Sequence, residues 1–296
     1  MLWMFAAPAS EDALAALYAA HPDATLVGGA TDVGLWITKQ LQDMPVLIHT
    51  GRARELRKVR VNDECGYLEI GAAVTYTEAM ETLTGHYPDL RPMMARIGAA
   101  QVRNAGTIGG NIANGSPIGD MQPPLFVLGA SLVLRSERGE RCIDIDQFYI
   151  DYGQQDLQPG EFLEKILLPL PSDGQLFRTY KLSKRFEQDI SAVSAAFLLE
   201  LDKGEVKVFR ACYGGMAAVP KRASSCEAKL LGQAWNEGVV ERAAETLTEN
   251  FQPISDWRAS ADYRMQGARN FLRRFYRESV GGEDTRLDTQ AGRTQA

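Results

Sequence analysis

Two glycine-rich segments follow short apolar runs in this sequence. The first, LVGGATDVG, covers residues 26–34, and the second, RNAGTIGGNIANGSPIGD, covers residues 103–120. A pyrophosphate has to approach backbone N–H groups closely, and a Cβ atom would hold it away or forbid a positive φ. Neither segment has the G-x-G-x-x-G pattern of a Rossmann fold. The two segments therefore predict a dinucleotide site in another fold, with purely structural turns as the alternative.

Neutral polar side chains accompany the glycines. Hydroxyl and amide groups can hydrogen-bond phosphate or ribityl oxygens, whereas a carboxylate only accepts and suits sugar hydroxyls. Because an interior glycine costs a helix about 1 kcal/mol and a proline costs more, we expect the second segment to be a loop. The hydroxyl and amide candidates are Thr31, Thr107, Asn111, Asn114 and Ser116, and the carboxylate is Asp120.

Cysteine and histidine offer little further chemistry. No C-x-x-C or other iron–sulfur or zinc spacing occurs. With only three histidines, the sequence has few candidate ligands for a histidine-based metal centre and few candidate bases for a hydrolase triad. We expect buried, reduced thiols and no disulfide or metal site. The cysteines are Cys65, Cys142, Cys212 and Cys226.

The composition is that of a globular protein. The chain has 296 residues, 45% of them apolar, and 32 basic against 38 acidic residues give a net charge of −6. No cationic run could neutralise a nucleic acid, and no uncharged stretch reaches the roughly 18 residues that span a bilayer. The N-terminal residues lack the basic region of a signal peptide. We therefore expect a cytoplasmic protein that binds neither nucleic acid nor membrane.

Helix and strand signals alternate in the first half of the chain. Ser10 can cap a helix that begins at Glu11, and Thr75 with Glu78 forms a capping box before another helix. Further helices are predicted at residues 33–41 and 88–99. Strands are predicted at residues 25–29, 46–50, 67–74, 131–136, 141–145 and 162–171, with a hairpin joining 131–136 to 141–145.

A cluster of turn-forming residues, PLPSDGQ at 169–175, divides the chain. It predicts one domain at residues 1–172 and a second at residues 177–280. Residues 281–296 have no apolar period and are predicted to be a disordered tail. In the second domain we expect three antiparallel strands at 177–182, 194–202 and 206–216, and helices within 221–233, 238–250 and 261–279.

Three segments together resemble the FAD-binding part of molybdenum-containing hydroxylases, most closely the small subunit of bacterial xanthine dehydrogenases. They are residues 26–34, 101–120 and 180–193, the last of which reads YKLSKRFEQDISAV. The likeness runs from about Phe5 to Arg277. It implies an α+β fold: a two-lobed FAD-binding domain of the vanillyl-alcohol-oxidase (PCMH) type, then a small α+β domain with a three-stranded antiparallel sheet and helices.

The resemblance also implies contacts with FAD. Thr107 matches a position near the pyrophosphate, Asp120 a sugar-binding aspartate, and Lys181 a lysine that contacts the cofactor. Ile97 stands where some relatives place an aromatic ring against the isoalloxazine, so part of the stacking is lost. Gln188 and Asp189 match an acidic segment that affects access of the electron acceptor. The implied FAD-binding residues are Leu26, Val27, Gly28, Gly29, Ala30, Thr31, Asp32, Val33, Ile97, Thr107, Gly109, Gly110, Asn111, Ser116, Asp120 and Lys181.

The implied role is electron transfer. A molybdopterin-binding large subunit would hydroxylate the substrate, and [2Fe–2S] clusters of a partner would pass electrons singly to FAD, which would deliver a hydride to NAD⁺. No residue of this chain would then be catalytic. The family's small subunits usually begin with a [2Fe–2S] module of eight cysteines, and this sequence lacks it. The clusters are therefore expected on a separate subunit or on a missing N-terminal module.

The mode of flavin attachment and two other functions complete the expectations. No His, Cys or Tyr lies in either glycine segment, which predicts noncovalent FAD. One alternative function is a scaffold subunit without flavin, and the other is a stand-alone FAD oxidoreductase with its own substrate. The sequence determines neither the substrate of the complex nor its electron acceptor.

Overall fold

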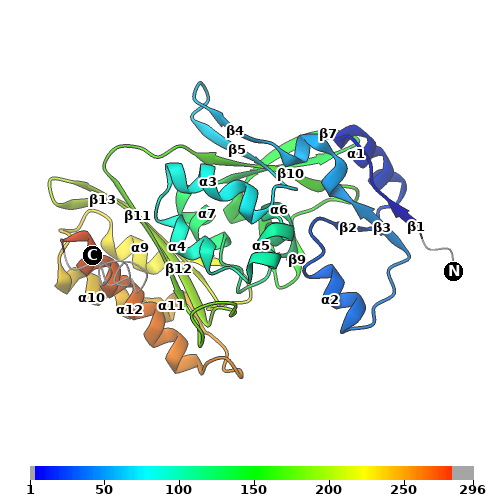
Figure 1. Cartoon of the computed structure of the whole chain (residues 1–296). Coiled ribbons are helices and arrows are strands. Elements are labelled where there is room, and N and C mark those ends of the chain that lie inside the picture. Colours follow the sequence, from blue (N-terminus) through cyan, green and yellow to red (C-terminus); the bar gives the residue numbers. More distant parts are fainter. Residues whose placement is uncertain (1–3, 282–296) are drawn as a thin grey trace, which may run out of the picture.

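The computed structural model of the chain describes residues 4–281. Figure 1 shows an N-terminal lobe at one end, a central lobe, and a C-terminal domain at the other end. The described residues form one parallel sheet and three antiparallel sheets together with many short helices. The predicted α+β fold class is confirmed. The predicted disordered tail, apart from Gly281, lies outside the described residues.

The N-terminal lobe is built on a parallel sheet with strand order β1-β3-β2. Helix α1 (Glu11–Ala20) begins where predicted, because the Ser10 side chain accepts a hydrogen bond from the N–H of Ala13. The first glycine segment leaves the sheet at the carboxyl end of β2 and enters α2 (Val33–Thr38). The strands are β1 (Met4–Ala6), β2 (Thr25–Val27) and β3 (Val46–His49).

The central lobe contains a five-stranded antiparallel sheet with order β4-β5-β10-β6-β7. The predicted hairpin is confirmed as β6 and β7. Strand β4 was not predicted, although its four residues, VRVN, alternate apolar and polar side chains; the run is short, and none of its residues is buried. The strands are β4 (Val59–Asn62), β5 (Tyr67–Gly71), β6 (Ser131–Ser136), β7 (Gly139–Asp144) and β10 (Phe162–Pro169).

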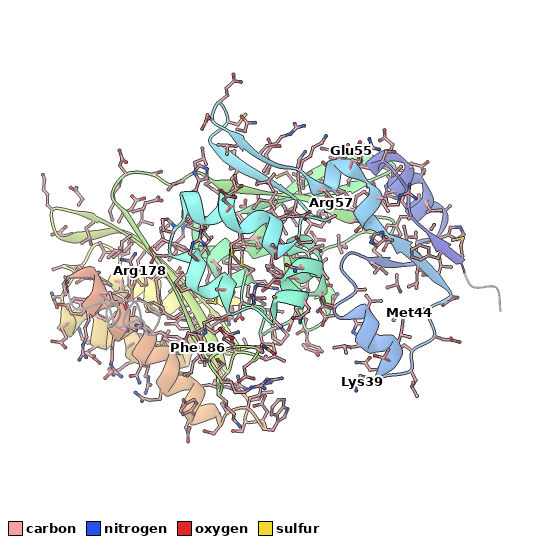
Figure 2. The ribbon with its side chains drawn as sticks, in the orientation of Figure 1. Lys39, Met44, Glu55, Arg57, Arg178 and Phe186 are labelled. Carbon is pink, nitrogen blue, oxygen red and sulfur yellow. The ribbon has the colours of Figure 1, made fainter. Side chains whose placement is uncertain are left out.

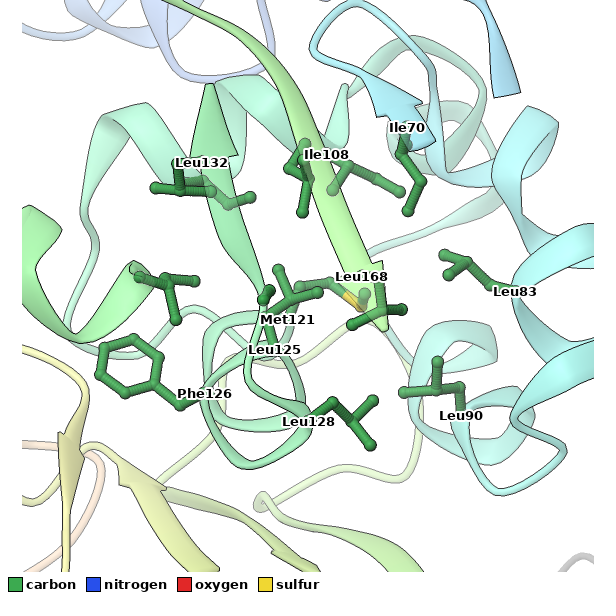
Figure 3. Packing of buried hydrophobic residues seen from close by; sticks show 14 of the residues in the cluster. Ile70, Leu83, Leu90, Ile108, Met121, Leu125, Phe126, Leu128, Leu132 and Leu168 are labelled. Carbon is green, nitrogen blue, oxygen red and sulfur yellow. The ribbon is translucent and has the colours of Figure 1, made fainter. Parts of the chain in front are cut away.

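The core of the central lobe lies between this sheet and three helices. They are α3 (Tyr76–His86), α4 (Leu90–Ala95) and α7 (Gln122–Leu128). Figure 3 shows Leu83 of α3 and Leu90 of α4 beside Leu168 of β10, with Leu125 of α7 close to them. All four side chains are almost completely buried. Helix α7 is buried along its whole length, so it forms the centre of the fold.

The predicted capping box at the start of α3 is confirmed. Thr75 Oγ1 accepts from the N–H of Glu78, and Glu78 Oε2 accepts from the N–H of Thr75. We expect Thr75→Ala to lower the free energy of unfolding by about 1 kcal/mol, because the N–H of Glu78 loses its side-chain acceptor. Urea unfolding measures this. An unchanged midpoint would mean that the capping box does not stabilise the fold.

The second glycine segment is largely helical, so the prediction of a loop was wrong for most of it. Its first residues end α5 (Ala100–Ala105), and its middle forms α6 (Ile108–Asn114), capped by the side chain of Thr107. A Cβ on Gly109 would lie 2.4 Å from the Cβ of Ala72. Close packing against the end of β5 therefore requires this glycine and offsets its poor helix propensity. The helix ends at Gly115, whose φ is 65°, and residues 115–120 form the loop.

The C-terminal domain has an antiparallel sheet of order β11-β12-β13-β14. The three predicted strands are confirmed as β11 (Gln175–Leu182), β12 (Val193–Asp202) and β13 (Glu205–Gly214). The sheet has a fourth strand, β14 (Lys221–Arg222), which two residues were too few to predict. Phe177 and Leu198 join the core of the central lobe, whereas Phe197 and Phe209 pack under the C-terminal helices. The sheet therefore has one face on each core.

Four helices cover the outer face of the C-terminal sheet (Figure 1). The predicted helix at 238–250 is divided in two at Thr246, whose hydroxyl donates to the carbonyl of Ala243. The helices are α9 (Ser224–Leu230), α10 (Glu237–Glu245), α11 (Leu247–Asn250) and α12 (Ala261–Ser279).

Short elements connect the larger ones. They are the 3₁₀ turns η1 (Thr50–Arg52) and η2 (Arg54–Arg57), helix α8 (Ile145–Phe148), and the paired strands β8 (Tyr149–Asp151) and β9 (Gln154–Gln155). None of the described helices is long and apolar enough to cross a membrane.

The four cysteines are free, but only two of them are buried. Cys212 of β13 lies in the core of the central lobe and Cys226 in the core under the C-terminal helices, and burial raises the pKa of both thiols. Cys65 and Cys142 are exposed, so the prediction of burial was wrong for them. Cys65 lies in the turn between β4 and β5, and Cys142 lies on the edge strand β7, where solvent reaches the side chain.

Candidate functional site

The two glycine segments, 77 residues apart in their numbering (26 against 103), are in contact in the structure. A Cβ on Gly29 would lie 1.6 Å from the carbonyl oxygen of Ala105, and a Cβ on Gly28 would lie 2.8 Å from Thr107 Oγ1. The carbonyl oxygen of Ala105 belongs to the main chain, so it cannot rotate away from a Cβ on Gly29 as a side chain could. The glycines therefore allow the loop after β2 to pack directly against the turn between α5 and α6.

A cavity of about 460 Å³ lies where the two segments meet. Of the residues predicted to bind a cofactor, Val27, Ser116, Asp120 and Lys181 are not part of its wall. The remaining predicted residues all line it: Leu26, residues 28–33, Ile97, Thr107 and residues 109–111. Asn114, the other amide candidate, also lines it.

The loop after β2 presents unused backbone donors. Ala30 has a φ of 58°, and its carbonyl accepts from the N–H of Gly34. Within the described part of the chain, the N–H groups of residues 29–32 have no hydrogen-bond partner. Consecutive free N–H groups form a concave site suited to an anion. This arrangement can hold phosphate oxygens.

Asn111, a residue of the same cavity wall, has a side-chain acceptor that the described residues do not use. Its Oδ1 is buried and has no hydrogen-bond partner among the described residues. An unpaired buried acceptor costs about 1–3 kcal/mol, so a native protein normally pairs it with another group. A ligand with a hydroxyl or ring N–H at this point would satisfy Asn111.

Two carboxylates lie in the wall of the cavity. Burial raises the pKa of Asp32, and Asn114 Nδ2 donates to Asp32 Oδ2 at 3.3 Å. Burial works against ionisation of Glu161 as well, but hydrogen bonds from Arg141 and from the N–H of Gln158 outweigh it and lower its pKa. Glu161 is thus an anion paired with Arg141, whereas Asp32 has no ion-pair partner among the described residues.

Sequence reasoning missed several residues of this wall. Trp36 and Tyr76 line the cavity, as do Glu161 and Phe162 from the start of β10. Trp36 is the second residue after the first glycine segment and could have been included for that reason. Tyr76 and the β10 residues carry no local signal, because only the packing of distant strands brings them to the cavity.

Asp120 and Lys181 form a buried ion pair with each other behind the cavity. Lys181 Nζ contacts Asp120 Oδ2, and only 2% and 8% of the two side chains are exposed. Ser191 Oγ donates to Asp120 Oδ1 at 2.5 Å. Burial raises the pKa of Tyr76, and the nearby Asp120 carboxylate adds to the shift. Asp120 therefore lies close to the cavity wall that Tyr76 forms.

Gln188 and Asp189 lie in the exposed connection between β11 and β12. Gln188 has a φ of 52°. Asp189 accepts hydrogen bonds from the N–H groups of Arg185 and Ile190, and the bond from Arg185 contributes most to lowering its pKa. This carboxylate is therefore used within its own loop. No cluster of three or more His, Cys, Asp or Glu side chains in the described part of the chain could hold a metal.

Comparison with known proteins decides the family. Residues 3–171 match the family described as the FAD binding domain in molybdopterin dehydrogenase. The chain belongs to this family. Residues 178–279 match the CO dehydrogenase flavoprotein C-terminal domain. The resemblance to the FAD-binding part of molybdenum hydroxylases is confirmed.

Curated relatives agree with this assignment. The xanthine dehydrogenase FAD-binding subunit of Escherichia coli O157:H7 is 29% identical over 274 residues, which cover 92% of this chain and 94% of that protein. The xanthine dehydrogenase/oxidase of Gallus gallus is 30% identical over 258 residues, which cover 82% of this chain but only 19% of that longer protein.

Solved structures show the same fold. One chain of the carbon monoxide dehydrogenase from Hydrogenophaga pseudoflava superimposes with a TM-score of 0.87 at 27% identity, covering 93% of this chain and 96% of that one. One chain of quinoline 2-oxidoreductase from Pseudomonas putida 86 gives a TM-score of 0.85 at 26% identity, covering 94% and 96%.

The cavity of this FAD-binding family member fits its cofactor on two counts. Among the described residues, the N–H groups of residues 29–32 have no acceptor and Asn111 Oδ1 has no donor. FAD carries a pyrophosphate that suits the N–H groups, and hydroxyl and ring N–H groups that suit an unpaired acceptor. The residues present therefore suit FAD.

The unpaired amide of Asn111 leads to a prediction. We expect Asn111→Ala to weaken FAD binding about tenfold, since one hydrogen bond of about 1–1.5 kcal/mol is lost from the complex. The FAD-free protein should keep its stability, because Oδ1 has no bond to lose there. Titration by flavin fluorescence measures the affinity, and urea unfolding measures the stability. Asn104→Ala, outside the cavity wall, is the control; equal affinity of both variants would place Asn111 away from the cofactor.

Proposed function

We propose that this chain is the FAD-binding electron-transfer subunit of a xanthine dehydrogenase-type molybdenum hydroxylase. It would bind FAD without a covalent bond, receive electrons from [2Fe–2S] clusters of a partner, and pass them to NAD⁺. The observation that carries the proposal is the cavity between the glycine segments, with its free N–H groups and the unpaired acceptor of Asn111. The name and length of the Escherichia coli relative support a separate subunit.

Different residues of the cavity would bind different parts of FAD. The N–H groups of residues 29–32 would bind the pyrophosphate, and Thr107 keeps α6 in place by accepting from the N–H of Gly110 at 3.0 Å. Ile97 and Trp36 give the cavity apolar surface for the ring systems. Bound FAD would accept electrons one at a time and release them as a pair. The protein's own contribution is to position the cofactor and keep water from it.

Noncovalent binding is supported by the tyrosines of the cavity. A covalent flavin link needs a reactive His, Cys or Tyr, and the tyrosines in the wall are Tyr18 and Tyr76. Burial raises the pKa of both phenols, so their reactive phenolate forms are disfavoured. We therefore expect acid precipitation to release the yellow colour into the supernatant.

The partners and the domains belong to the same proposal. We assign the molybdopterin to a large partner subunit and the [2Fe–2S] clusters to a further subunit or to an N-terminal module. We divide this chain into an FAD-binding domain at residues 1–172 and a smaller domain at residues 177–280, joined where the chain passes from β10 to β11. Four free cysteines support a reducing, cytoplasmic location.

The test uses the full chain. Purified protein should show a flavin spectrum, and the flavin-loaded chain should be bleached by NADH without oxygen, which is the reverse of the proposed last step. A folded but colourless protein that takes up no added FAD would contradict the proposal. If the chain binds FAD but the flavin does not react with NADH, the proposal of FAD as the cofactor stands and that of NAD⁺ as the acceptor is rejected.

A further inference from the structure

The connection between β11 and β12, residues 183–192, is tied to the central lobe at both ends by one carboxylate. Just before it, Lys181 Nζ contacts Asp120 Oδ2. Near its far end, Ser191 Oγ donates to Asp120 Oδ1 at 2.5 Å. We call residues 183–192 the β11–β12 loop. Its ends are fixed, while residues 184–188 between them are exposed.

Arg96 binds the first half of the β11–β12 loop and the end of the strand before it. Its Nε donates to the carbonyl of Phe186 at 2.9 Å, its Nη1 to the carbonyl of Lys181 at 3.1 Å, and its Nη2 to Ser183 Oγ at 3.1 Å. The guanidinium also lies 4.8 Å from the centre of the Phe186 ring. Figure 2 shows Phe186 at the end of the C-terminal sheet. In the sequence it lies far from α4, which ends at Ala95. One arginine of the central lobe thus contacts three residues of the C-terminal domain.

The same arginine adjoins the cofactor cavity. It follows α4 directly, and the next residue, Ile97, lines that cavity. Arg103 Nη1 donates to the carbonyls of Ile97 and Gly98 at 3.2 and 3.0 Å, which fixes the main chain there. On its other side Arg96 lines a second cavity of about 390 Å³ together with loop residues 183–187. Residues 96 and 97 therefore lie between the cavity of the glycine segments and the loop.

We propose that Arg96 is a positioning residue that couples FAD binding to the β11–β12 loop. FAD packed against Ile97 restrains the main chain at 96–97. This restraint holds the guanidinium on its three acceptors, which are the carbonyl of Lys181 in β11 and two groups of the β11–β12 loop. Coupling of this kind is reciprocal, so a fixed loop also favours bound FAD. The inference rests on the proposed function, because FAD is the ligand in the cavity.

Within residues 4–281, the other hydrogen bonds of the exposed part of the loop do not connect it to the cavity wall. Ser183 Oγ donates to the carbonyl of Arg185 at 2.6 Å, and Asp189 accepts from the N–H of Arg185, so these bonds move with the loop. Lys184 Nζ reaches the carbonyl of Trp257, an exposed bond within the same domain. Arg96 therefore supplies the contacts that join the exposed part of the loop to the cavity wall.

Limited digestion of the full chain by trypsin tests the proposal, since Lys184 and Arg185 are exposed basic residues of the loop. Cleavage there follows the population of the open loop. In the wild type, saturating FAD should slow cleavage after these two residues about threefold or more. In Arg96→Gln, cleavage of the FAD-free protein should be about tenfold faster, and FAD should no longer protect, although it still binds. Arg96→Lys should lie between them, because one ammonium cannot reach three acceptors as a guanidinium does.

Arg91→Gln is the matched control. Arg91 lies in α4, the helix that Arg96 follows. It donates to Thr84 Oγ1 at 2.8 Å and has no hydrogen bond to the loop among the described residues. It should behave as the wild type, and cleavage after Arg138 should be the same in all variants. Unchanged cleavage and unchanged FAD protection in Arg96→Gln would overturn the inference and leave the proposed function intact. Failure of the wild type to bind FAD would overturn both the proposed function and the coupling. In that case, the cleavage rates of the FAD-free wild type and FAD-free Arg96→Gln would still show whether Arg96 holds the loop.

Discussion

A chain with Gly29 replaced by alanine is expected to bind FAD about 100-fold more weakly than the wild type. The new Cβ would lie 1.6 Å from the carbonyl oxygen of Ala105, so the loop after β2 has to move away from α5. Its N–H groups then no longer meet the pyrophosphate together. The loss of one or two hydrogen bonds to a charged group, at about 1.5–3 kcal/mol each, corresponds to this factor. Flavin content after purification and a fluorescence titration measure the effect.

Gly34→Ala is the control for Gly29→Ala. It lies in the same glycine segment, and a Cβ there would have no neighbour within 4 Å. This variant should keep both its flavin and its melting temperature. Equal flavin content in Gly29→Ala and Gly34→Ala would mean that the loop after β2 does not bind FAD.

The largest loss of stability is expected from Asp120→Asn. The Lys181 side chain is 2% exposed, and without the carboxylate its charge would be buried and unpaired. Breaking a buried ion pair in this way costs about 3–5 kcal/mol. Urea unfolding of the FAD-free protein measures it. We also expect weaker FAD retention, because Asp120 lies behind Tyr76 of the cavity wall and holds the β11–β12 loop.

A double variant separates the ion pair from other effects of Asp120. Asp120→Asn combined with Lys181→Met removes both charges and should recover most of the stability, as paired replacement of buried charges often does. Arg57→Gln breaks an ion pair with Glu78 whose side chains are 48% and 40% exposed, and it should cost less than about 1 kcal/mol. A loss as small as this for Asp120→Asn would show that the buried pair does not stabilise the fold.

Helices with caps and strands bounded by turn residues were predictable from the sequence. The Ser10 cap and the capping box of Thr75 and Glu78 act between residues three apart, so their geometry follows from local sequence. The turn-forming residues 169–175 lie where the chain passes from β10 to β11, since their preference for turns is also local. The error at residues 103–114 arose because Gly109 meets Ala72, a contact between distant segments that helix propensity does not include.

The candidate site was predictable in part. Its glycine segments are continuous in the sequence and carry most of the residues that line the cavity. Residues outside these segments also reach the cavity, namely Trp36, Tyr76, Glu161 and Phe162. Arg96 reaches Lys181 in β11 and Phe186 of the β11–β12 loop, which lie 85 and 90 positions further along the chain. Contacts of this range depend on how the sheets pack.

The sequence by itself determined the family, the two glycine segments and the residue types available to FAD, because these are properties of short continuous stretches. The tertiary structure decided how those residues are used. It turned most of the second segment into helices, opened a cavity beside the first, and placed Asp120 against Lys181, which is 61 positions away. In that low-dielectric contact each charge is satisfied by the other, and only the packing of the C-terminal sheet on the central lobe could bring the two together.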